Sequence, residues 1–235
     1  MKAVAKFPAF CRESNIDGNT IEMTCKRELA TMFAHWGQET GKRSPSNGEF
    51  WTQGLYYTEE IAKSDYKSTA NGNDVNYPPQ DGVQYFGRGP FQLSWNYNYG
   101  FFSKVYSTDG YDGRMELLKD PDAVSRSGYT AMASGIWFYM TPQKPKPSMH
   151  DVMTGYFEPN ATDLSNNIDA SFATTINIIN GGIECGRGRD YPKVKSRGEY
   201  FQEWLNFFDL PAENGELDCG TQPNGLPAGG TAGKA

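Results

Sequence analysis

Glu39 stands at the edge of an apolar helical stripe, where a carboxyl group is well placed to act as an acid. The apolar residues before it have the i, i+3, i+4, i+7 spacing of one helix face: Leu29, Met32, Phe33 and Trp36. Gly41 is a typical residue at the end of such a helix. A carboxyl group beside the stripe loses part of its hydration, and dehydration favours the protonated form that a general acid needs.

Glu59 and Glu60, in the stretch "YYTEE", are candidates for a second carboxylate. Two carboxyl groups in unlike environments are the minimum for hydrolysis of a glycosidic bond. The chain holds 28 acidic residues, so these three, taken alone, also fit ordinary solvated positions at a helix end and in a first helical turn.

Residues 85–100, "YFGRGPFQLSWNYNYG", combine aromatic rings with short polar side chains. In an extended segment, Phe91 and Leu93 would face one way, and the hydrogen-bonding side chains of the alternate positions would face the other. These alternate residues are Gln92 and Ser94, and the next rings and amide are Tyr97, Asn98 and Tyr99. Such a mixture suits the apolar face, hydroxyls and acetamido group of a sugar. We favour this interpretation over a Gly-Pro turn that leads into an aromatic core strand.

Arg197 lies inside the apolar stripe of a predicted last helix at 193–209. The stripe consists of Val194, Phe201, Leu205 and Phe208. A buried guanidinium without a counter-charge is strongly unfavourable, so the pattern predicts an acidic partner, Glu184 or Glu39. The alternative is a long side chain whose charged end reaches water.

The elements that carry these residues are predicted to be mainly α-helical, separated by long polar loops. The expected helices are one ending at Thr40, a short one at 58–64, a long one at 121–140, one begun by a Ser148 capping box, one ended by Gly181 and Gly182, and the last at 193–209. Residues 67–90 are expected to form a long loop. We expect one catalytic domain at 1–210 and a Gly/Pro-rich tail or linker at 211–235.

Composition excludes several classes of protein. Hydrophobic residues make up 37% and aromatic residues 14% of the 235 positions, which indicates a globular chain. No apolar run is long enough to cross a membrane, and a net charge of −6 argues against nucleic acid as a partner. The N-terminal stretch lacks the apolar core of a signal peptide, so either the protein is not secreted or a start Met replaced the signal.

The cysteines and histidines point to disulfides and not to a metal. The four cysteines, Cys11, Cys25, Cys185 and Cys219, include no C-x-x-C pair, and their even number suits two disulfides in an oxidising compartment. The two histidines, His35 and His150, stand far apart, so a His-based metal site is not expected. No G-x-S-x-G motif supports a serine triad.

Several long motifs resemble the chitinases of glycoside hydrolase family 19. These are "HWGQETG", "YFGRGPFQLSWNYNYG", "IWFYMTPQKPKPSMHDVMTG" and "INIINGGIECGRG", and the resemblance runs from about Phe33 to Phe208. It implies a bilobal, lysozyme-like helical fold with a deep cleft. It also implies a cofactor-free enzyme that hydrolyses β-1,4-linked N-acetylglucosamine polymers with inversion. We therefore expect a secreted, endo-acting monomer whose partner is chitin or its oligosaccharides.

The resemblance assigns roles to particular residues. Glu39 matches the general acid, and Glu60 the general base, with Glu59 one residue away. Ser94 and Gln92 match residues that position the attacking water and the acetamido group. An inverting pair of carboxyl groups is expected about 6.5–9.5 Å apart. The other matches are substrate-binding or cleft residues: Tyr77, Asn98, Lys146, Asn180, Glu184 and Arg197, of which the last two form a buried network beside the acid. Tyr97 is a further substrate-binding candidate because of its aromatic ring.

The chain departs from the plant pattern of this family in several places. The histidine expected before the acid is displaced to Gln38, with His35 four residues before Glu39, and Tyr77 stands where a tryptophan is usual. Cys185 fits the family's C-terminal bridge, and we expect it to pair with Cys219. The resemblance does not assign a pairing to the two N-terminal cysteines.

Two alternative functions stay open at this point. One is a peptidoglycan-cleaving endolysin of the same fold, which a basic surface would favour and the acidic composition does not. The other is a non-catalytic chitin-binding protein, which the presence of both Glu39 and Glu60 makes the weaker alternative.

Overall fold

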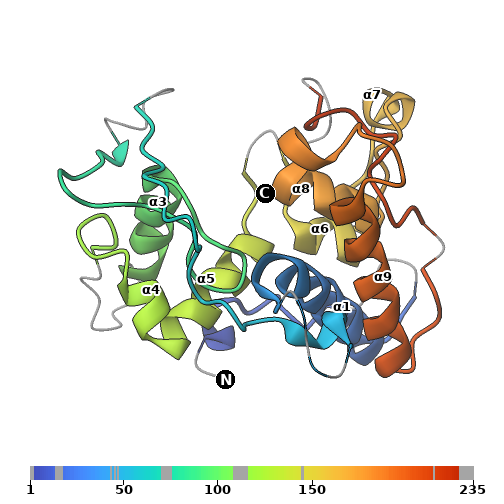
Figure 1. Cartoon of the computed structure of the whole chain (residues 1–235). Helices are drawn as coiled ribbons and strands as arrows, with labels where there is room; N and C mark the ends of the chain where they lie inside the picture. The colour runs from blue at the N-terminus through green and yellow to red at the C-terminus, as the bar shows by residue number, and fades with distance from the viewer. Residues whose placement is uncertain are drawn as a thin grey trace. The chain divides into compact units, whose positions relative to one another are not determined.

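A computed structural model describes residues 3–13, 18–42, 44, 46, 48–69, 76–107, 116–143, 146–213 and 215–227, which are helical or irregular and include no β-strand. The elements are η1 (Val4–Lys6), α1 (Ile21–Thr40), η2 (Phe50–Gln53), α3 (Asn96–Ser107), α4 (Ala123–Arg126), α5 (Gly128–Met140), α6 (Met149–Thr154), α7 (Ala161–Ser165), α8 (Phe172–Glu184) and α9 (Pro192–Phe207) (Figure 1). The predicted mainly α-helical class is confirmed.

The chain divides into two units, and α5 crosses from one to the other. The first unit contains Met1–Lys6 and Leu55–Phe138, and the second contains Phe7–Gly54 and Tyr139–Ala235. Glu39 therefore belongs to the second unit and Glu60 to the first. The predicted division into a catalytic domain at 1–210 and a tail stays a prediction.

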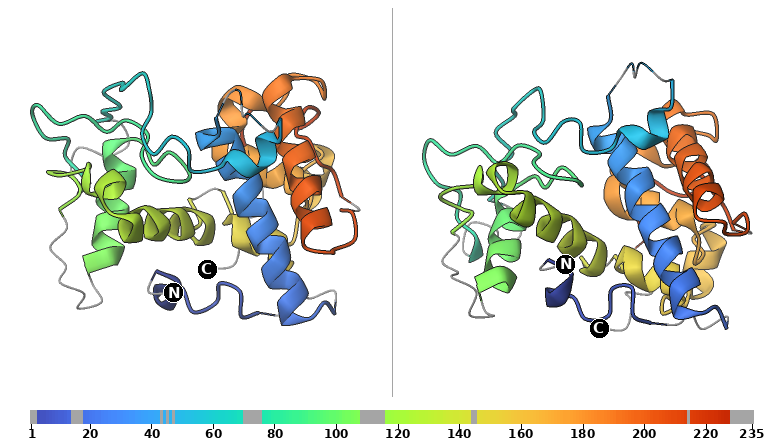
Figure 2. Two further views of the ribbon diagram at one scale, coloured as in Figure 1. Left: turned by 60° about the horizontal axis from the view of Figure 1, so that its bottom comes forward. Right: turned by 90° about the horizontal axis from the view of Figure 1, so that it is seen from below.

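The second unit is built around α1, which packs along α9 (Figure 2). The helix begins at the N-cap Thr20, whose hydroxyl accepts a hydrogen bond from the Met23 amide at 3.2 Å, and it ends at Thr40 before Gly41, as predicted. In the predicted stripe, Met32 and Trp36 are buried, while the other two residues, Leu29 and Phe33, are half-buried. Small residues on other faces are buried too, so α1 is enclosed by more than one neighbour.

The predicted capping box starts α6, but the predicted end of α8 is wrong. The Ser148 hydroxyl accepts from the Asp151 amide at 2.9 Å, and the Asp151 carboxylate accepts from the Ser148 amide at 3.3 Å. Instead of ending at Gly181 and Gly182, α8 continues to Glu184. A Cβ atom at Gly181 would lie 2.0 Å from the Asn177 side-chain oxygen, so this glycine permits close packing within the helix and does not terminate it.

Arg88 organises the first unit, together with the aromatic residues of α3 and α5. Its guanidinium is buried, and it donates to Asp122 at 2.5 Å, to the Tyr99 hydroxyl at 2.9 Å and to backbone carbonyls. Phe102 of α3 packs on Trp137 of α5, with ring centroids 5.4 Å apart. The buried charge is thus paired and hydrogen-bonded, which makes its burial tolerable.

Two predicted helices of this unit are wrong. Residues 58–64 are not helical, because the Glu60 amide donates to the Gly87 carbonyl at 2.8 Å and the Gly89 amide donates to the Thr58 carbonyl at 2.9 Å. The helix expected at 121–140 is broken at Ser127, whose backbone is extended and whose hydroxyl accepts from the Thr130 amide. Ser127 thereby starts α5 as a cap would.

The stretch expected to be a tail includes well-packed residues. Cys219 and Gln222 are buried, and Gln222 accepts a hydrogen bond from the Asn177 amide group of α8 at 3.1 Å. Within the described residues, no helix is both long and apolar enough to span a lipid bilayer.

Candidate active site

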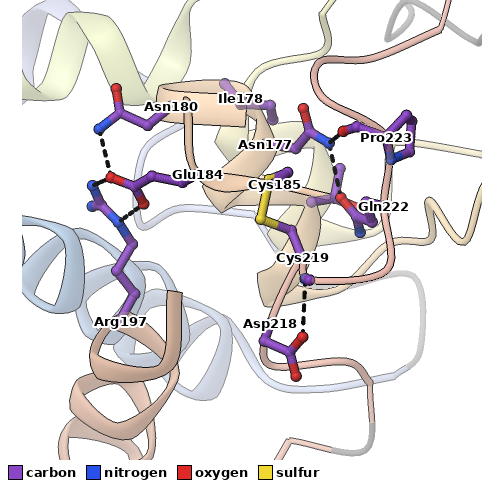
Figure 3. The surroundings of a disulfide bond; sticks show 12 residues. Asn177, Ile178, Asn180, Glu184, Cys185, Arg197, Asp218, Cys219, Gln222 and Pro223 are labelled. Atoms are coloured by element: carbon purple, nitrogen blue, oxygen red, sulfur yellow. Dashed lines mark hydrogen bonds and ion pairs between the residues drawn. A yellow bond between two sulfur atoms is a disulfide. The ribbon is translucent and has the colours of Figure 1, made fainter. Parts of the chain in front are cut away.

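Three helices of the second unit bring together the group around Glu39. Glu39 is in the last turn of α1, Arg197 is on α9, and α8 supplies Asn180 and Glu184. Asn180 has a non-helical backbone, with φ −134° and ψ 22°, so α8 is kinked at the residue that contacts the acid. Figure 3 shows the Arg197 guanidinium directed at Glu184, with Asn180 beside them.

Arg197 pairs with both predicted acidic partners. Its Nε and Nη2 donate to the two oxygens of Glu184 at 2.9 and 3.0 Å, and its Nη2 also donates to Glu39 Oε1. The Asn180 side-chain amide donates to Glu39 Oε1 and to Glu184 Oε1, both at 3.1 Å. Among the described residues, Glu39 Oε2 receives no hydrogen bond. One oxygen of the carboxyl group is therefore held in place, and the other is left for a reacting group.

His35 completes this network as a neutral side chain. Its Nδ1 lies 3.1 Å from Arg197 Nη1, which can only donate, so Nδ1 accepts and the ring proton is on Nε2, 2.9 Å from the Thr175 hydroxyl. Burial and the charge of Arg197 hold the pKa of His35 well below its ordinary value. The histidine that seemed displaced in the sequence thus supports the arginine and has no direct contact with the acid among the described hydrogen bonds.

Glu39, Glu184, Arg197 and the neutral His35 together carry a charge of −1 when both glutamates are ionised. Arg197 is 1% exposed, and Glu184 is equally buried. Burial opposes the charge of Arg197, but Glu39 and Glu184 more than offset it and raise the pKa of the guanidinium.

Glu60, in the first unit, is held by different means. Its Oε1 accepts from the Tyr66 hydroxyl at 2.9 Å, and its Oε2 accepts from the Gly87 amide at 3.1 Å. One phenol and one backbone amide thus fix the Glu60 carboxylate, and neither contact comes from an arginine or a lysine. Carboxylate oxygens carry about four acceptor positions, so acceptor capacity remains for a water.

The neighbouring Glu59 is engaged elsewhere. Its carboxylate accepts from the Ser125 hydroxyl at 2.7 Å and pairs with Lys63 at 3.0 Å. These hydrogen bonds, first from Ser125 and then from Lys63, lower the pKa of Glu59. A carboxylate with a lowered pKa is a weaker base, and this one is already tied to α4. Of the two adjacent glutamates, Glu60 is therefore the better candidate base.

The predicted polar residues of the "FQLSWNYN" stretch lie in one short segment that leads into α3. Phe91 and Leu93 are buried while Gln92 and Ser94 are half-buried, as expected, but the extended backbone predicted for this segment is wrong, because the chain turns at 89–92 and Gln92 has φ +51°. The Ser94 hydroxyl donates to the Gln92 carbonyl at 2.8 Å, and Asn98 donates to the Ser94 carbonyl at 2.9 Å. With its proton committed, the Ser94 oxygen keeps its acceptor positions for a water or a sugar hydroxyl.

Aromatic rings adjoin this segment. Trp95 is 37% exposed, and its ring lies 6.1 Å from that of Tyr97, nearly parallel, and 5.2 Å from that of Tyr66. Tyr77, predicted to stack on substrate, is half-buried. Its ring packs closely on Gly100 of α3, where a Cβ atom would lie only 2.4 Å from the ring. The first unit thus groups exposed or half-exposed rings with hydrogen-bonding side chains, as sugar binding requires.

Lys146 belongs to the group of the second unit and not to that of the first. Its Nζ donates to the Ile178 carbonyl on α8 at 2.8 Å, two residues before Asn180. Burial lowers the pKa of this ammonium group. The structure therefore brings Glu39, Asn180, Glu184 and Arg197 together, with Lys146 on the same helix surface.

Two disulfides tie down segments of the second unit. Cys185, the C-cap residue of α8, is bonded to Cys219, the predicted pairing (Figure 3). Cys11 is bonded to Cys25 of α1, a pairing that the sequence left open. The first bond fixes the end of α8 one residue beyond Glu184, and so supports the network around Glu39. The described residues include no cluster of three or more His, Cys, Asp or Glu side chains suited to a metal ion.

This fold, with one acid in a buried ionic network and a second in a ring-lined loop, is that of a lysozyme-like helical glycoside hydrolase. Residues 1–219 match the family model for glycoside hydrolase family 19, described as class I chitinase, and the chain belongs to this family. The match extends beyond the 33–208 region in which the motifs were apparent.

Individual relatives agree with this assignment. Endochitinase 2 of Solanum tuberosum is 38% identical over 94% of this chain, which spans 65% of that protein. An inactive chitinase-like protein of Hevea brasiliensis is also 38% identical, over 96% of this chain and 67% of its own length. A crystal structure of a class IV chitinase from Zea mays superposes with a TM-score of 0.63 at 28% identity, covering 92% of this chain and 82% of that one. The chain thus spans about two thirds of the curated relatives it matches.

Sequence reasoning missed the partners of Glu60 and the role of His35. Tyr66 carries no motif, and its contact with Glu60 depends on a left-handed backbone, with φ +47°, that nothing in "KSDYKS" signals. The role of His35 could have been predicted from its position, because it falls four residues before Glu39 and so lies on nearly the same face of α1.

Proposed function

We propose that this chain is an endo-acting chitinase that hydrolyses β-1,4-linked N-acetylglucosamine polymers with inversion. The observation that carries the proposal is the unequal environment of the two Glu39 oxygens in a member of a chitinase family. Arg197 and Asn180 hold Oε1, while Oε2 has no partner among the described residues. A general acid needs this arrangement, because its orientation is fixed and its proton is free to move.

In this mechanism, protonated Glu39 donates its proton from Oε2 to the glycosidic oxygen as the bond to the anomeric carbon breaks. The proton leaves behind a carboxylate whose charge Arg197 and Asn180 stabilise through Oε1. Stabilising charge that appears only as the reaction proceeds lowers the barrier and not merely the energy of the bound state.

Glu60 acts as the general base. It removes a proton from a water that attacks the anomeric carbon from the opposite face of the sugar. The Tyr66 hydroxyl and the Gly87 amide orient the carboxylate, and Ser94 accepts a hydrogen bond from the same water. Gln92, Tyr97, Asn98, Lys146 and Tyr77 bind the sugar units in this proposal.

A pair of matched variants tests the assignment of the base. Glu60→Gln should remove nearly all hydrolysis of chitin oligosaccharides, whereas Glu59→Gln should keep most of it and lose mainly the contacts to Ser125 and Lys63. The reverse order of activities would transfer the role to Glu59. The test is needed because a relative described as inactive is as similar in sequence as an endochitinase.

Product stereochemistry tests inversion. Hydrolysis of a chitin oligosaccharide, followed by NMR before mutarotation, should release the α-anomer first. An initial β-anomer would rule out a single displacement by water at the anomeric carbon. Long oligosaccharides cleaved at internal bonds would support endo action, and a loss of turbidity with bacterial cell walls but not with chitin would favour the peptidoglycan-cleaving alternative.

The two disulfides favour an oxidising compartment, and we propose that the protein acts outside the cytosol, where chitin is encountered. Intact-mass measurement of the protein purified from its natural source, with and without a thiol reagent, tests this point. Reaction of two or more cysteines without prior reduction would contradict it.

A further inference from the structure

A hollow of the second unit lies far from Glu39. Its volume is about 460 Å³, and it forms where the start of α1, the end of α6, the loop before α8 and the segment after α9 meet. Met23 lines it, and 16 residues of the same helix separate Met23 from Glu39, roughly 24 Å at the helical rise. This volume is in the range of small-molecule sites.

The polar side chains of this cavity leave one charge uncompensated. Arg27 pairs with Glu213 at 2.5 Å, and Glu213 also accepts from the Gly215 amide at 3.3 Å, so those two charges satisfy each other. Asp169 accepts from the Ser171 hydroxyl, but it forms no ion pair among the described residues. Burial, with Glu216 and Glu213 as further contributions, raises the pKa of Asp169, as expected for a carboxyl group that lacks a cation.

Apart from Asn19, the other side chains that line the cavity are aliphatic or thioether. Met23, Met153 and Leu205 are among its lining residues, and no aromatic ring lines it. Sugars generally bind against aromatic faces, so this cavity does not resemble a chitin subsite. Methionine side chains adapt to ligands of irregular shape, which suits a compact apolar body.

We propose that this cavity binds a small organic monocation, whose ammonium group pairs with Asp169 and whose apolar part lies on Met23, Met153 and Leu205. A neutral molecule of the same shape would gain only the apolar contact. An anion would be repelled by Asp169 and could not displace Glu213 from Arg27. The inference does not depend on the proposed chitinase activity, because none of these residues belongs to the catalytic groups.

Three probes of equal length separate the apolar and the charged contributions: n-hexylammonium, 1-hexanol and hexanoate. Titration of the full chain, followed by NMR of the methionine methyl groups, should show hexylammonium binding about tenfold more tightly than hexanol, and hexanoate most weakly. Shifts should be confined to Met23 and Met153. Equal affinity for the ammonium and the alcohol, or no binding at millimolar concentration, would overturn the proposal.

Two variants and a control locate the site. Asp169→Asn keeps an acceptor for Ser171, and it should lower the affinity for hexylammonium to that for hexanol. The control, Asp190→Asn, is at an exposed position outside the cavity lining and should change neither affinity. Ala170→Trp, at an exposed position of the lining, should block all three probes. Hydrolysis of chitin oligosaccharides should be unaltered in Asp169→Asn. Undiminished ammonium binding in Asp169→Asn or in Ala170→Trp would place the ligand elsewhere and refute the assignment.

Discussion

The two candidate catalytic acids are held by opposite kinds of structure. Glu39, in the second unit, is fixed by side chains from two other helices, the charged Arg197 of α9 and the neutral Asn180 of α8. Glu60, in the first unit, is fixed by a backbone amide and a phenol in a segment without helix. An ionic network that is buried in a core couples strongly to folding, whereas a surface loop held by a few hydrogen bonds does so weakly.

Backbone geometry follows the same division. In the first unit, five described non-glycine residues have left-handed backbones: Leu55 at φ +70°, Lys63 at +49°, Tyr66 at +47°, Gln92 at +51° and Trp95 at +75°. The described residues of α1, α8 and α9 include none. Such conformations are unfavourable for these residue types and persist where the surrounding structure imposes them. We infer that an ionic network positions the carboxyl group of Glu39, and that a strained loop positions the carboxyl group of Glu60.

The largest expected effect is on catalysis by Glu39→Gln. The amide oxygen can still accept from Arg197 and Asn180, so the fold should be kept. Turnover of chitin oligosaccharides should fall roughly 10²–10⁴-fold, as is typical when a general acid is removed. Steady-state kinetics and thermal unfolding of the same preparation measure both. Near-normal turnover would show that Glu39 is not the acid.

Arg197→Ala should have the largest effect on stability. It leaves Glu184, which is 1% exposed, and Glu39 without a counter-charge, and a buried carboxylate stripped of its partner typically costs about 3–5 kcal/mol. Denaturant unfolding gives this free energy. The loss of stability in Arg197→Lys should be smaller than in Arg197→Ala but not zero. An ammonium offers one compact charge, whereas the guanidinium reaches Glu39, Glu184 and His35 together.

A double variant separates lost charge balance from lost packing. Arg197→Met with Glu184→Gln removes both buried charges, so it should be more stable than Arg197→Ala although it changes more atoms. If the double variant is the less stable of the two, packing by the arginine stem dominates and the electrostatic description of this network is wrong.

Local periodicity explains which parts were predictable from sequence. The position of Arg197 in an apolar stripe predicted a buried guanidinium with an acidic partner, Glu184 or Glu39, since helical spacing determines which side chains point inward. The Ser148 capping box was predictable for the same local reason. The surroundings of Glu60 were not, because they depend on pairing of residues 58–60 with 87–89, across nearly 30 positions of chain. A helix was predicted there instead, and α3 was missed because residues 97–99 were interpreted only as rings and an amide that contact a sugar.

Tyr66→Phe tests the other half of the comparison, with a smaller expected effect. Loss of the hydroxyl leaves Glu60 held by the Gly87 amide alone, and one such half-exposed hydrogen bond contributes about 1 kcal/mol, or roughly fivefold in kcat. We expect kcat to fall with little change in KM, and the melting temperature to stay nearly constant.

Tyr85→Phe is the matched control, because it removes the same atom from the same unit. The Tyr85 hydroxyl is buried and donates to the Leu118 carbonyl at 2.7 Å, away from the proposed acids. Its loss should lower the melting temperature and leave kcat unchanged. If Tyr66→Phe behaves like Tyr85→Phe, then Tyr66 is a structural residue and the loop does not position Glu60.

The smallest expected effect is a pH dependence of stability that is confined to the second unit. His150 of α6 is buried, with Nδ1 2.6 Å from Glu28 Oε1 of α1 and Nε2 3.2 Å from Glu13 Oε2. Burial alone would lower the pKa of His150, but the hydrogen bond to Glu28 and the charges of Glu28 and Glu13 raise it above its ordinary value of 6.5.

A raised folded-state pKa means that the folded protein binds this proton more tightly than the unfolded chain does. The contribution to stability is therefore fully present below about pH 6.5 and is lost as the pH rises through the folded-state pKa of His150. The midpoint of thermal unfolding should decline over that interval in the natural chain and decline less in His150→Gln, which cannot lose a proton. Hydrogen exchange should place the loss of protection in α1 and α6, and not in α3 of the first unit. An equal pH slope in the two proteins, or a loss spread evenly over both units, would show that the charged pair of His150 and Glu28 does not control stability in this range.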